Sequence, residues 1–226
     1  ARLKSDQIEN WLNERQSDAE IFARSSALSR LVERFKVDTH NEAGEFIANR
    51  IGASRATKSH YRSITVINEK GGFILGDGNA LPLTEPIQAL LKKARTQGTV
   101  VHSELVTTPE GGATMYFVAP LRHSDAPGRT TLSGFAVFCV DVEADLFQDL
   151  AQWPMSNHGG EILLLQKRAD QAVMLNPPRD ATMQIYGPEI PLSTPKAVAA
   201  MAFAEGANGK LVGETCAGKA VLATFR

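Results

Sequence analysis

The sequence presents the same succession of strand, turn and helix signals twice, and this repetition limits the folds that the chain can adopt. In the first copy, Pro86 lies in the first turn of an expected helix that ends at Gly98. In the second copy, Pro195 lies 109 positions after Pro86, and Gly206 lies 108 positions after Gly98. This nearly constant period predicts a duplicated structural unit whose two helices have almost the same length.

Each expected helix lies between pairs of strands. In the first copy Thr84 is expected to cap the helix, because threonine is a favoured residue at that position. The strands of this copy are expected at residues 64–67, 73–75, 99–106, 114–121 and 134–140. The polar residues 123–130 are expected to form a loop before the last strand.

The second copy repeats this order with fewer strands. Its strands are expected at residues 161–165, 172–175, 210–214 and 220–225. Thr194 and Pro195 are expected to begin its helix. No counterpart of the strand at 134–140 follows, so the second sheet is expected to be one strand short within this chain.

The residues before the first copy show helical periodicity. Apolar residues recur there at spacings of mostly three and four, which predicts one long helix. They are Ile8, Trp11, Leu12, Phe22, Leu28, Leu31, Val32 and Phe35. At about 1.5 Å per residue this helix would extend about 45 Å, so part of it should project beyond the lobe that follows. The expected domains are the leading helix (1–36), a first lobe (37–150) and a second lobe (151–226).

The charge balance and the lengths of the apolar runs limit the partners that the chain can have. The 24 Lys and Arg residues nearly balance the 25 Asp and Glu residues, so the chain has no global positive field to attract nucleic acid or an anionic membrane. The longest apolar runs, 135–140 and 162–165, are far shorter than the roughly 18 residues that a membrane span needs. Because the helical pattern begins at once, without an initiator Met or a signal peptide, the chain is expected to be part of a longer protein.

No motif for catalysis, cofactor binding or metal binding occurs in the sequence. The two cysteines, Cys139 and Cys216, are too few for a disulfide framework or a structural zinc site. The five histidines lack the spacing of metal ligands, and neither a phosphate-binding glycine loop nor a nucleophile elbow is present. The chain is therefore expected to be no enzyme and to hold no cofactor and no metal.

The order of a long helix and two lobes of antiparallel strands resembles the double Cache sensor domains, whose lobes have a PAS-like fold. The resemblance is carried by residues 64–76 (ITVINEKGGFILG), 116–121 (YFVAPL), 134–142 (GFAVFCVDV) and 160–179 (GEILLLQKRADQAVMLNPPR). It implies an α+β fold in which each lobe has a central antiparallel sheet flanked by helices. It also implies a periplasmic or extracellular region of a bacterial histidine kinase, diguanylate cyclase or chemoreceptor, joined to the inner membrane only by flanking helices outside this chain.

The resemblance also implies a small-molecule site in the membrane-distal lobe, which here would be residues 37–150. In the amino-acid-binding members, an Asp at the end of the last distal strand holds the amino group of the ligand, and Asp141 stands at that position. The Arg-x-Trp signature of those members does not occur between Asp77 and Thr99, so the ligand stays unidentified. Asp141 also precedes an expected short helix at 142–150, which its carboxylate would cap. The two roles are compatible.

Three further residues are candidates for the same site, and each has a structural alternative. Tyr116, on an expected strand, would either line a pocket or fill the core. Asp77, beside a glycine, would either contact the ligand or only form a turn. Arg122, at a strand end, would either bind a carboxylate or remain a solvated charge. Cys139 is expected to be a small buried hydrophobic residue.

Three functions are compatible with these observations. The first is a sensor in which a small polar molecule binds the distal lobe of a homodimer, and its occupancy is transmitted through the N-terminal helix. The second is a ligand-free module for dimerisation or protein interaction, which would use an exposed apolar helix face at Trp11, Leu12 and Phe22. The third is a hydrolase with a cleft of converging titratable residues.

Overall fold

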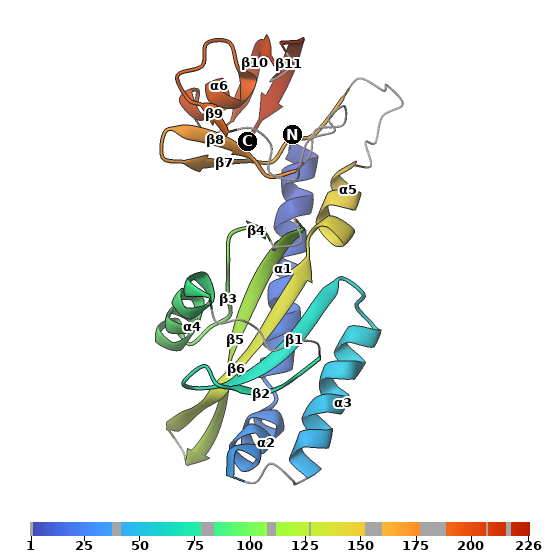
Figure 1. The fold of residues 1–226 in the computed structure, drawn as a ribbon, viewed down its shortest axis with the longest axis vertical. Coiled ribbons are helices and arrows are strands. Elements are labelled where there is room, and N and C mark those ends of the chain that lie inside the picture. The colour runs from blue at the N-terminus through green and yellow to red at the C-terminus, as the bar shows by residue number, and fades with distance from the viewer. Residues whose placement is uncertain are drawn as a thin grey trace. The chain divides into compact units, whose positions relative to one another are not determined.

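The chain folds into two compact units (Figure 1). A computed structural model describes residues 2–37, 42–77, 84–107, 112–126, 128–151, 160–176, 189–206, 208–215 and 218–226. The larger unit consists of residues 11–106 and 113–145. The smaller unit consists of residues 1–10, 107–112 and 146–226. Cys216 lies outside the described residues.

The leading segment forms two helices, α1 (Arg2–Ala23) and α2 (Ser26–Val37), so the prediction of a single long helix is wrong. Ser25 interrupts the helix: its Oγ accepts a hydrogen bond of 3.2 Å from the backbone N–H of Leu28. This bond to the third residue of α2 is the geometry of an N-cap, which satisfies a donor that the first helical turn leaves free. The apolar spacing continues across the break, because both helices bury their apolar side against the same sheet. Helix α3 (Glu42–Ala56) follows.

An antiparallel sheet of six strands forms the centre of the larger unit. Its strands are β1 (Tyr61–Asn68), β2 (Phe73–Gly76), β3 (Val101–His102), β4 (Val106–Thr107), β5 (Ala113–Ala126) and β6 (Arg129–Asp141). The order is β2-β1-β6-β5-β3, and β4 also pairs with β5. The expected hairpin at 64–75 and the strands at 114–121 and 134–140 are confirmed.

Two strand predictions in this unit need correction. The segment 99–106 forms two short strands, β3 and β4, in place of one continuous strand. The segment 123–130 is not a loop, because its ends extend β5 and β6 into a longer hairpin in which His123 pairs with Thr131 and Ser124 with Thr130. Threonine suits extended backbone, so the polar character of this segment marks an exposed hairpin end rather than a loop.

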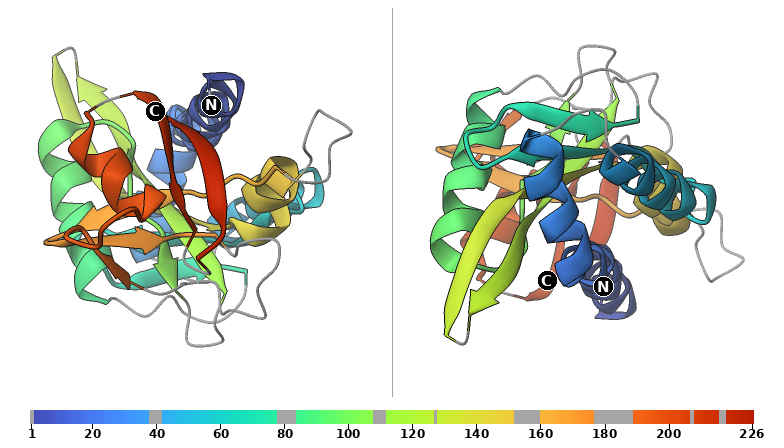
Figure 2. Two further views of the ribbon diagram at one scale, coloured as in Figure 1. Left: turned by 90° about the horizontal axis from the view of Figure 1, so that it is seen from above. Right: turned by 90° about the horizontal axis from the view of Figure 1, so that it is seen from below.

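Helices cover both faces of this sheet (Figure 2, right). Because Val118 and Val137 are cross-strand partners, they share one face, and both pack in a cluster with helix α4 (Glu85–Gln97). Phe117 and Phe138 are also partners and share the opposite face. There they meet α1 edge to face, Phe117 with Trp11 and Phe138 with Phe22.

These contacts overturn the expectation of an exposed apolar face on the leading helix, because Trp11 and Phe22 are buried against the sheet. The predictions for α4 are confirmed. Thr84 occupies the N-cap position, although its side chain forms no capping bond, and the helix has a proline at its start. Gly98 ends the helix in the left-handed conformation (φ 71°), which glycine adopts without strain.

The described residues of the smaller unit form two separate antiparallel sheets, the first turns of α1 and two short helices. One sheet comprises β7 (Leu165–Arg168), β8 (Gln171–Met174) and β9 (Glu189–Pro191), and the other comprises β10 (Gly209–Glu214) and β11 (Ala220–Phe225). The expected order of hairpin, helix and hairpin is present, with β9 in addition. Strand β7 begins at Leu165, four residues after the expected start at residue 161.

Helix α6 (Val198–Ala204) has 7 residues, against the 13 of α4, so the prediction of two helices of similar length is wrong. Lys196 has a positive φ of 60°, which is incompatible with a right-handed helix. The backbone at residue 197 then forms a bridge with Glu214. Thr194 and Pro195 therefore lie in a turn before the helix, and α6 begins later than the sequence signals suggested.

Candidate functional site

The face of the larger sheet that α4 covers changes from apolar to polar along its strands. Three cross-strand rows follow from the pairing of β1, β6 and β5. The first is Ile67–Phe135–Pro120, the second Thr65–Val137–Val118 and the third Ser63–Cys139–Tyr116. Beyond the third row, Asp141 pairs with Thr114. The polar end of this face is the candidate site, and we define it by Arg62, Ser63, Thr114, Tyr116, Cys139 and Asp141.

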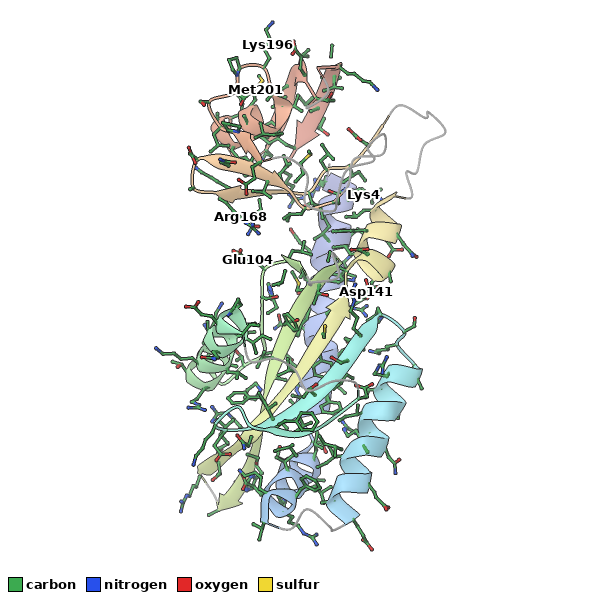
Figure 3. The ribbon with its side chains drawn as sticks, in the orientation of Figure 1. Lys4, Glu104, Asp141, Arg168, Lys196 and Met201 are labelled. Carbon is green, nitrogen blue, oxygen red and sulfur yellow. The ribbon has the colours of Figure 1, made fainter. Side chains whose placement is uncertain are left out.

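Asp141 ends β6 and caps the segment that follows (Figure 3). Its Oδ1 accepts hydrogen bonds of 3.1 Å from the backbone N–H groups of Glu143 and Ala144. These residues begin a single π-helical turn, Glu143–Phe147, which continues into α5 (Gln148–Ala151). The predicted capping role of Asp141 is confirmed.

Arg62 is the charge partner of Asp141. Its Nε donates a hydrogen bond of 2.9 Å to Asp141 Oδ2, and both side chains are partly exposed. Partial burial opposes ionisation of Asp141, but the bonds from Arg62 and from the two backbone N–H groups outweigh it and lower its pKa below the usual value. The site therefore contains an ionised carboxylate at neutral pH, and Arg62 binds its Oδ2 atom.

Hydroxyl groups surround the buried thiol of Cys139. Those of Ser63, Thr114 and Tyr116 face the thiol, in agreement with the cross-strand rows. Burial raises the pKa of Cys139, and the nearby Arg62 only partly offsets this effect, so the thiol remains protonated at neutral pH. Thr114 Oγ1 is buried and forms no hydrogen bond with a described nitrogen or oxygen atom.

Tyr116 is half-buried and packs against the apolar cluster under α4. Its backbone is fixed by Ser103, which donates its N–H to Tyr116 O and accepts the Tyr116 N–H at Oγ, each at 2.9 Å. The sequence left open which face Tyr116 occupies. The structure places it on the face covered by α4, in the row next to Asp141.

Asp77 and Arg122 do not join this cluster. Asp77 accepts the backbone N–H of Ile64 at 2.8 Å and pairs with Arg55 of α3, so it fastens the β1–β2 hairpin. Arg122 lies six residues beyond Tyr116 on β5, about 20 Å along the strand. It donates to the backbone oxygen of Arg95 at 3.0 Å, in the last turn of α4, where a cation stabilises the helix.

A second polar cluster connects the capped turn to α1. Asp145, in the π-helical turn, accepts a hydrogen bond of 2.6 Å from Trp11 Nε1 and lies 3.7 Å from Arg15 Nη1. Arg15 is only 8% exposed, and it also contacts the ring of His60. His60 in turn accepts the backbone N–H of Asp141 at its carbonyl oxygen, at 2.8 Å.

Asp18 completes this second cluster on α1. It accepts a hydrogen bond of 2.7 Å from Tyr61 Oη and pairs with Lys58. Burial and the neighbouring Asp18 raise the pKa of Tyr61, so its hydroxyl stays protonated and donates to the carboxylate. One turn of α1 is thus fixed by polar contacts both to β1 and to the turn that Asp141 caps.

The state of His60 gives this cluster a pH dependence. Burial lowers the pKa of His60, and the positive charge of Arg15 lowers it further, whereas Asp145 and Asp18 act in the opposite direction and Lys58 adds to the lowering. Below the usual histidine pKa of about 6.5 the unfolded chain therefore takes up more protons than the folded chain. The free energy of unfolding consequently decreases as the pH is lowered.

We expect the melting temperature to fall between pH 7 and pH 5, and to fall less in the variant His60→Gln. The variant His102→Gln, which changes an exposed histidine, serves as the control and should keep the decline of the unmodified chain. Scanning calorimetry over this pH range measures both. Identical pH profiles for His60→Gln and His102→Gln would contradict the assignment to His60.

Sequence reasoning did not identify Arg62, Ser63 or Thr114 as site residues. Arg62 lies 79 positions from Asp141, and only the register of β1 against β6 brings the two together. A basic residue near the start of a mostly buried strand was the available signal. In the described ranges, no group of three His, Cys, Asp or Glu side chains is arranged to hold a metal ion. Within the same ranges, no helix has the combined length and hydrophobicity of a bilayer span.

Comparison with known proteins finds a similarity of fold without a similarity of sequence. No family model matches the sequence, and no curated protein matches it significantly. An extracellular ligand-binding receptor from Desulfohalobium retbaense DSM5692 is similar over 96% of this chain and 36% of its own, at 13% sequence identity and a TM-score of 0.51. The ligand-binding domain of the Pseudomonas aeruginosa PAO1 amino-acid chemoreceptor PctC, in complex with GABA, is similar over 66% of this chain and 61% of its own. The identity with PctC is 19% and the TM-score 0.45.

The chain spans less than two thirds of the length of each of these two structures. At 13% identity, the similarity to the Desulfohalobium retbaense receptor concerns the fold alone. The expected α+β fold is confirmed: antiparallel sheets with flanking helices follow a long N-terminal helix.

Proposed function

We propose that this chain is the extracytoplasmic, ligand-sensing region of a transmembrane signalling receptor of the double Cache type, and that it is not itself a catalyst. The ligand site lies in the distal lobe, residues 37–150, at the polar end of the sheet face that α4 covers. The observation that carries the proposal is the ionised Asp141, held at a strand end beside the buried hydroxyl of Thr114 and the half-buried Ser63 and Tyr116.

The ligand is a small polar molecule with a cationic group. Asp141 offers a carboxylate that is ionised at neutral pH, and its present partner Arg62 is partly exposed. A ligand ammonium group would take the place of Arg62 at Oδ2, and an acidic group on the same ligand would pair with Arg62. The buried hydroxyl of Thr114 and the half-buried Tyr116 supply further polar contacts.

Ligand occupancy reaches the N-terminal helix through the turn that Asp141 caps. The turn carries Asp145, which contacts Trp11 and Arg15 of α1. A ligand that binds more tightly to one position of this turn shifts the equilibrium by its difference in affinity for the two positions. Since the turn is joined to α1 by hydrogen bonds and by charge, α1 follows it.

The remainder of the receptor lies outside this chain. We propose that flanking helices anchor it in the bacterial inner membrane, with this region on the periplasmic or extracellular side. A homodimer forms through the N-terminal helix, where Ile21 is 64% exposed on α1. The output module is a histidine kinase, a diguanylate cyclase or a chemoreceptor signalling domain.

The test is a thermal-shift screen of this chain against amino acids, amines, carboxylates and purines. A ligand at a hundred times its Kd should stabilise the chain by about 2.7 kcal/mol. Replacement of Asp141 by Asn retains an oxygen that can cap the turn but removes the charge. We expect Asp141→Asn to weaken binding about 10- to 100-fold, the usual loss for a hydrogen bond to a charged group.

The matched control is Asp170→Asn, which removes an equal charge from an exposed turn of the smaller unit. Its affinity should equal that of the unmodified chain. If broad libraries yield no concentration-dependent stabilisation, or if Asp170→Asn weakens binding as much as Asp141→Asn does, the proposed site is wrong.

A further inference from the structure

The smaller unit contains a cationic cavity that is separate from the candidate ligand site. Seven residues line it: Arg2, Asn208, Gly209, Lys210, Thr224, Phe225 and Arg226. Its volume is about 590 Å³, within the range of about 300–1,000 Å³ that small-molecule sites occupy. Three of the lining residues are Arg or Lys, and none is acidic.

The first register pairs of β10 and β11 form one wall of this cavity. Gly209 pairs with Phe225, and Lys210 pairs with Thr224 on the other face of the ladder. The ring of Phe225 lies against the Gly209 backbone, since a Cβ atom at position 209 would stand 2.8 Å from the ring. A side chain at position 209 would displace the ring of Phe225, so Gly209 allows this ring to form part of the cavity wall.

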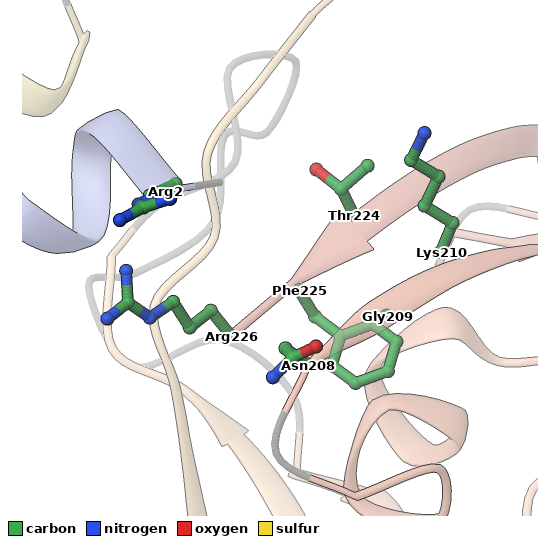
Figure 4. A pocket seen from close by; sticks show the side chains of 7 residues that line it. All are labelled: Arg2, Asn208, Gly209, Lys210, Thr224, Phe225 and Arg226. Atoms are coloured by element: carbon green, nitrogen blue, oxygen red, sulfur yellow. The ribbon is translucent and has the colours of Figure 1, made fainter.

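The guanidinium groups come from two distant parts of the chain. Arg2 begins α1 and Arg226 follows β11, and Figure 4 shows both on the same side of the cavity, with Lys210 and Thr224 on the other. Arg226 Nη1 lies 3.1 Å from Asp6 Oδ1, on the second turn of α1, and this ion pair joins the helix to the strand. It leaves Arg2 and Lys210 as the charges that an incoming anion would meet.

We infer that this cavity binds a phosphate group, as part of the headgroup of an anionic phospholipid. Arg supplies a planar fork of donors that matches phosphate oxygens, and Lys adds a point charge. The Phe225 ring offers an apolar contact for the glycerol and the first acyl carbons. The lipid source rests on the proposed function, in which flanking helices join this region to a membrane, whereas the phosphate chemistry of the cavity does not depend on it.

Flotation of the 226-residue chain with vesicles tests this inference. Vesicles of phosphatidylcholine alone are compared with vesicles that also contain phosphatidylglycerol. The double variant Arg2→Gln, Lys210→Gln is compared with Lys167→Gln, Arg168→Gln, which removes the same charge from exposed positions of β7 in the same unit. Each cation near an anionic membrane changes the partition coefficient about fivefold, so the cavity variant should bind phosphatidylglycerol vesicles about 25-fold more weakly than the unmodified chain.

The control variant should change vesicle binding less than twofold. Equal loss in both double variants, or no preference for phosphatidylglycerol, would overturn the inference. Titration with soluble glycerol phosphate, followed by thermal shift, distinguishes the source of the phosphate. Binding of glycerol phosphate that requires Arg2 and Lys210, without vesicle binding, would overturn the lipid assignment. Neither measurement involves Asp141, so failure here is distinct from failure of the sensor proposal.

Discussion

Replacement of Phe138 by alanine is expected to lower the free energy of unfolding of the larger unit by about 3–5 kcal/mol, the usual cost of removing a buried phenyl ring. The ring is 2% exposed. Its centroid lies 5.3 Å from that of Phe22 on α1 and 5.4 Å from that of Tyr61 on β1. The substitution therefore leaves a cavity between the sheet and α1, and the aromatic contacts on both sides are lost.

Urea denaturation followed by circular dichroism measures this effect. The control is Phe73→Ala, because Phe73 lies on β2 of the same sheet and is 50% exposed. Its loss should change the stability by no more than about 0.5 kcal/mol, as is usual at surface positions. Similar losses for the two variants would show that α1 is not packed on the sheet as described.

Replacement of Asp145 by alanine is expected to destabilise the larger unit by about 3 kcal/mol, because it leaves a buried cation without one of its partners. Arg15 loses the carboxylate 3.7 Å away, and Trp11 Nε1 loses its acceptor. The variant Asp145→Asn keeps an oxygen for Trp11 and should lose less. The exposed Asp149, on α5, provides the control Asp149→Ala, which should change the stability by about 0.5 kcal/mol or less.

A double-mutant cycle measures the interaction energy between Arg15 and Asp145. If Arg15 and Asp145 stabilise each other, the double variant Arg15→Met, Asp145→Ala should be more stable than the sum of the two single losses predicts. Strict additivity of the two losses would contradict a direct interaction between α1 and the capped turn. It would also remove the structural support for transmission from Asp141 to α1.

Local signals in the sequence predicted the elements that local chemistry determines. Helix α4 follows the position of Thr84, the early proline and the left-handed Gly98, and the β1–β2 hairpin follows its turn residues. The predictions failed where another interaction competes with the local signal. The apolar spacing continues through Ser25, although the hydroxyl of Ser25 caps a new helix. Pro195 predicted a helix start, but the positive φ of Lys196 places the start of α6 further along the chain.

The candidate site was predictable only in part, for a similar reason. Asp141 could be selected because strand, charge and following helix are adjacent in the sequence. Its partner Arg62 and the hydroxyl of Thr114 come from other strands, and their positions depend on strand register, which no short motif encodes. Register also determines that Asp77 and Arg122 lie apart from this cluster, where Asp77 contacts the β1–β2 hairpin and Arg122 the end of α4.

The break at Ser25 has a mechanical consequence. Helix α2 packs on β5 and β6, so it is fixed to the sheet independently of α1. Because no backbone hydrogen bond ladder runs through the joint, a small axial slide or twist of α1 need not strain α2. Any displacement of α1 would therefore be resisted by the contacts of α1 itself, among them those of Trp11 and Phe22 with the sheet, and not by α2.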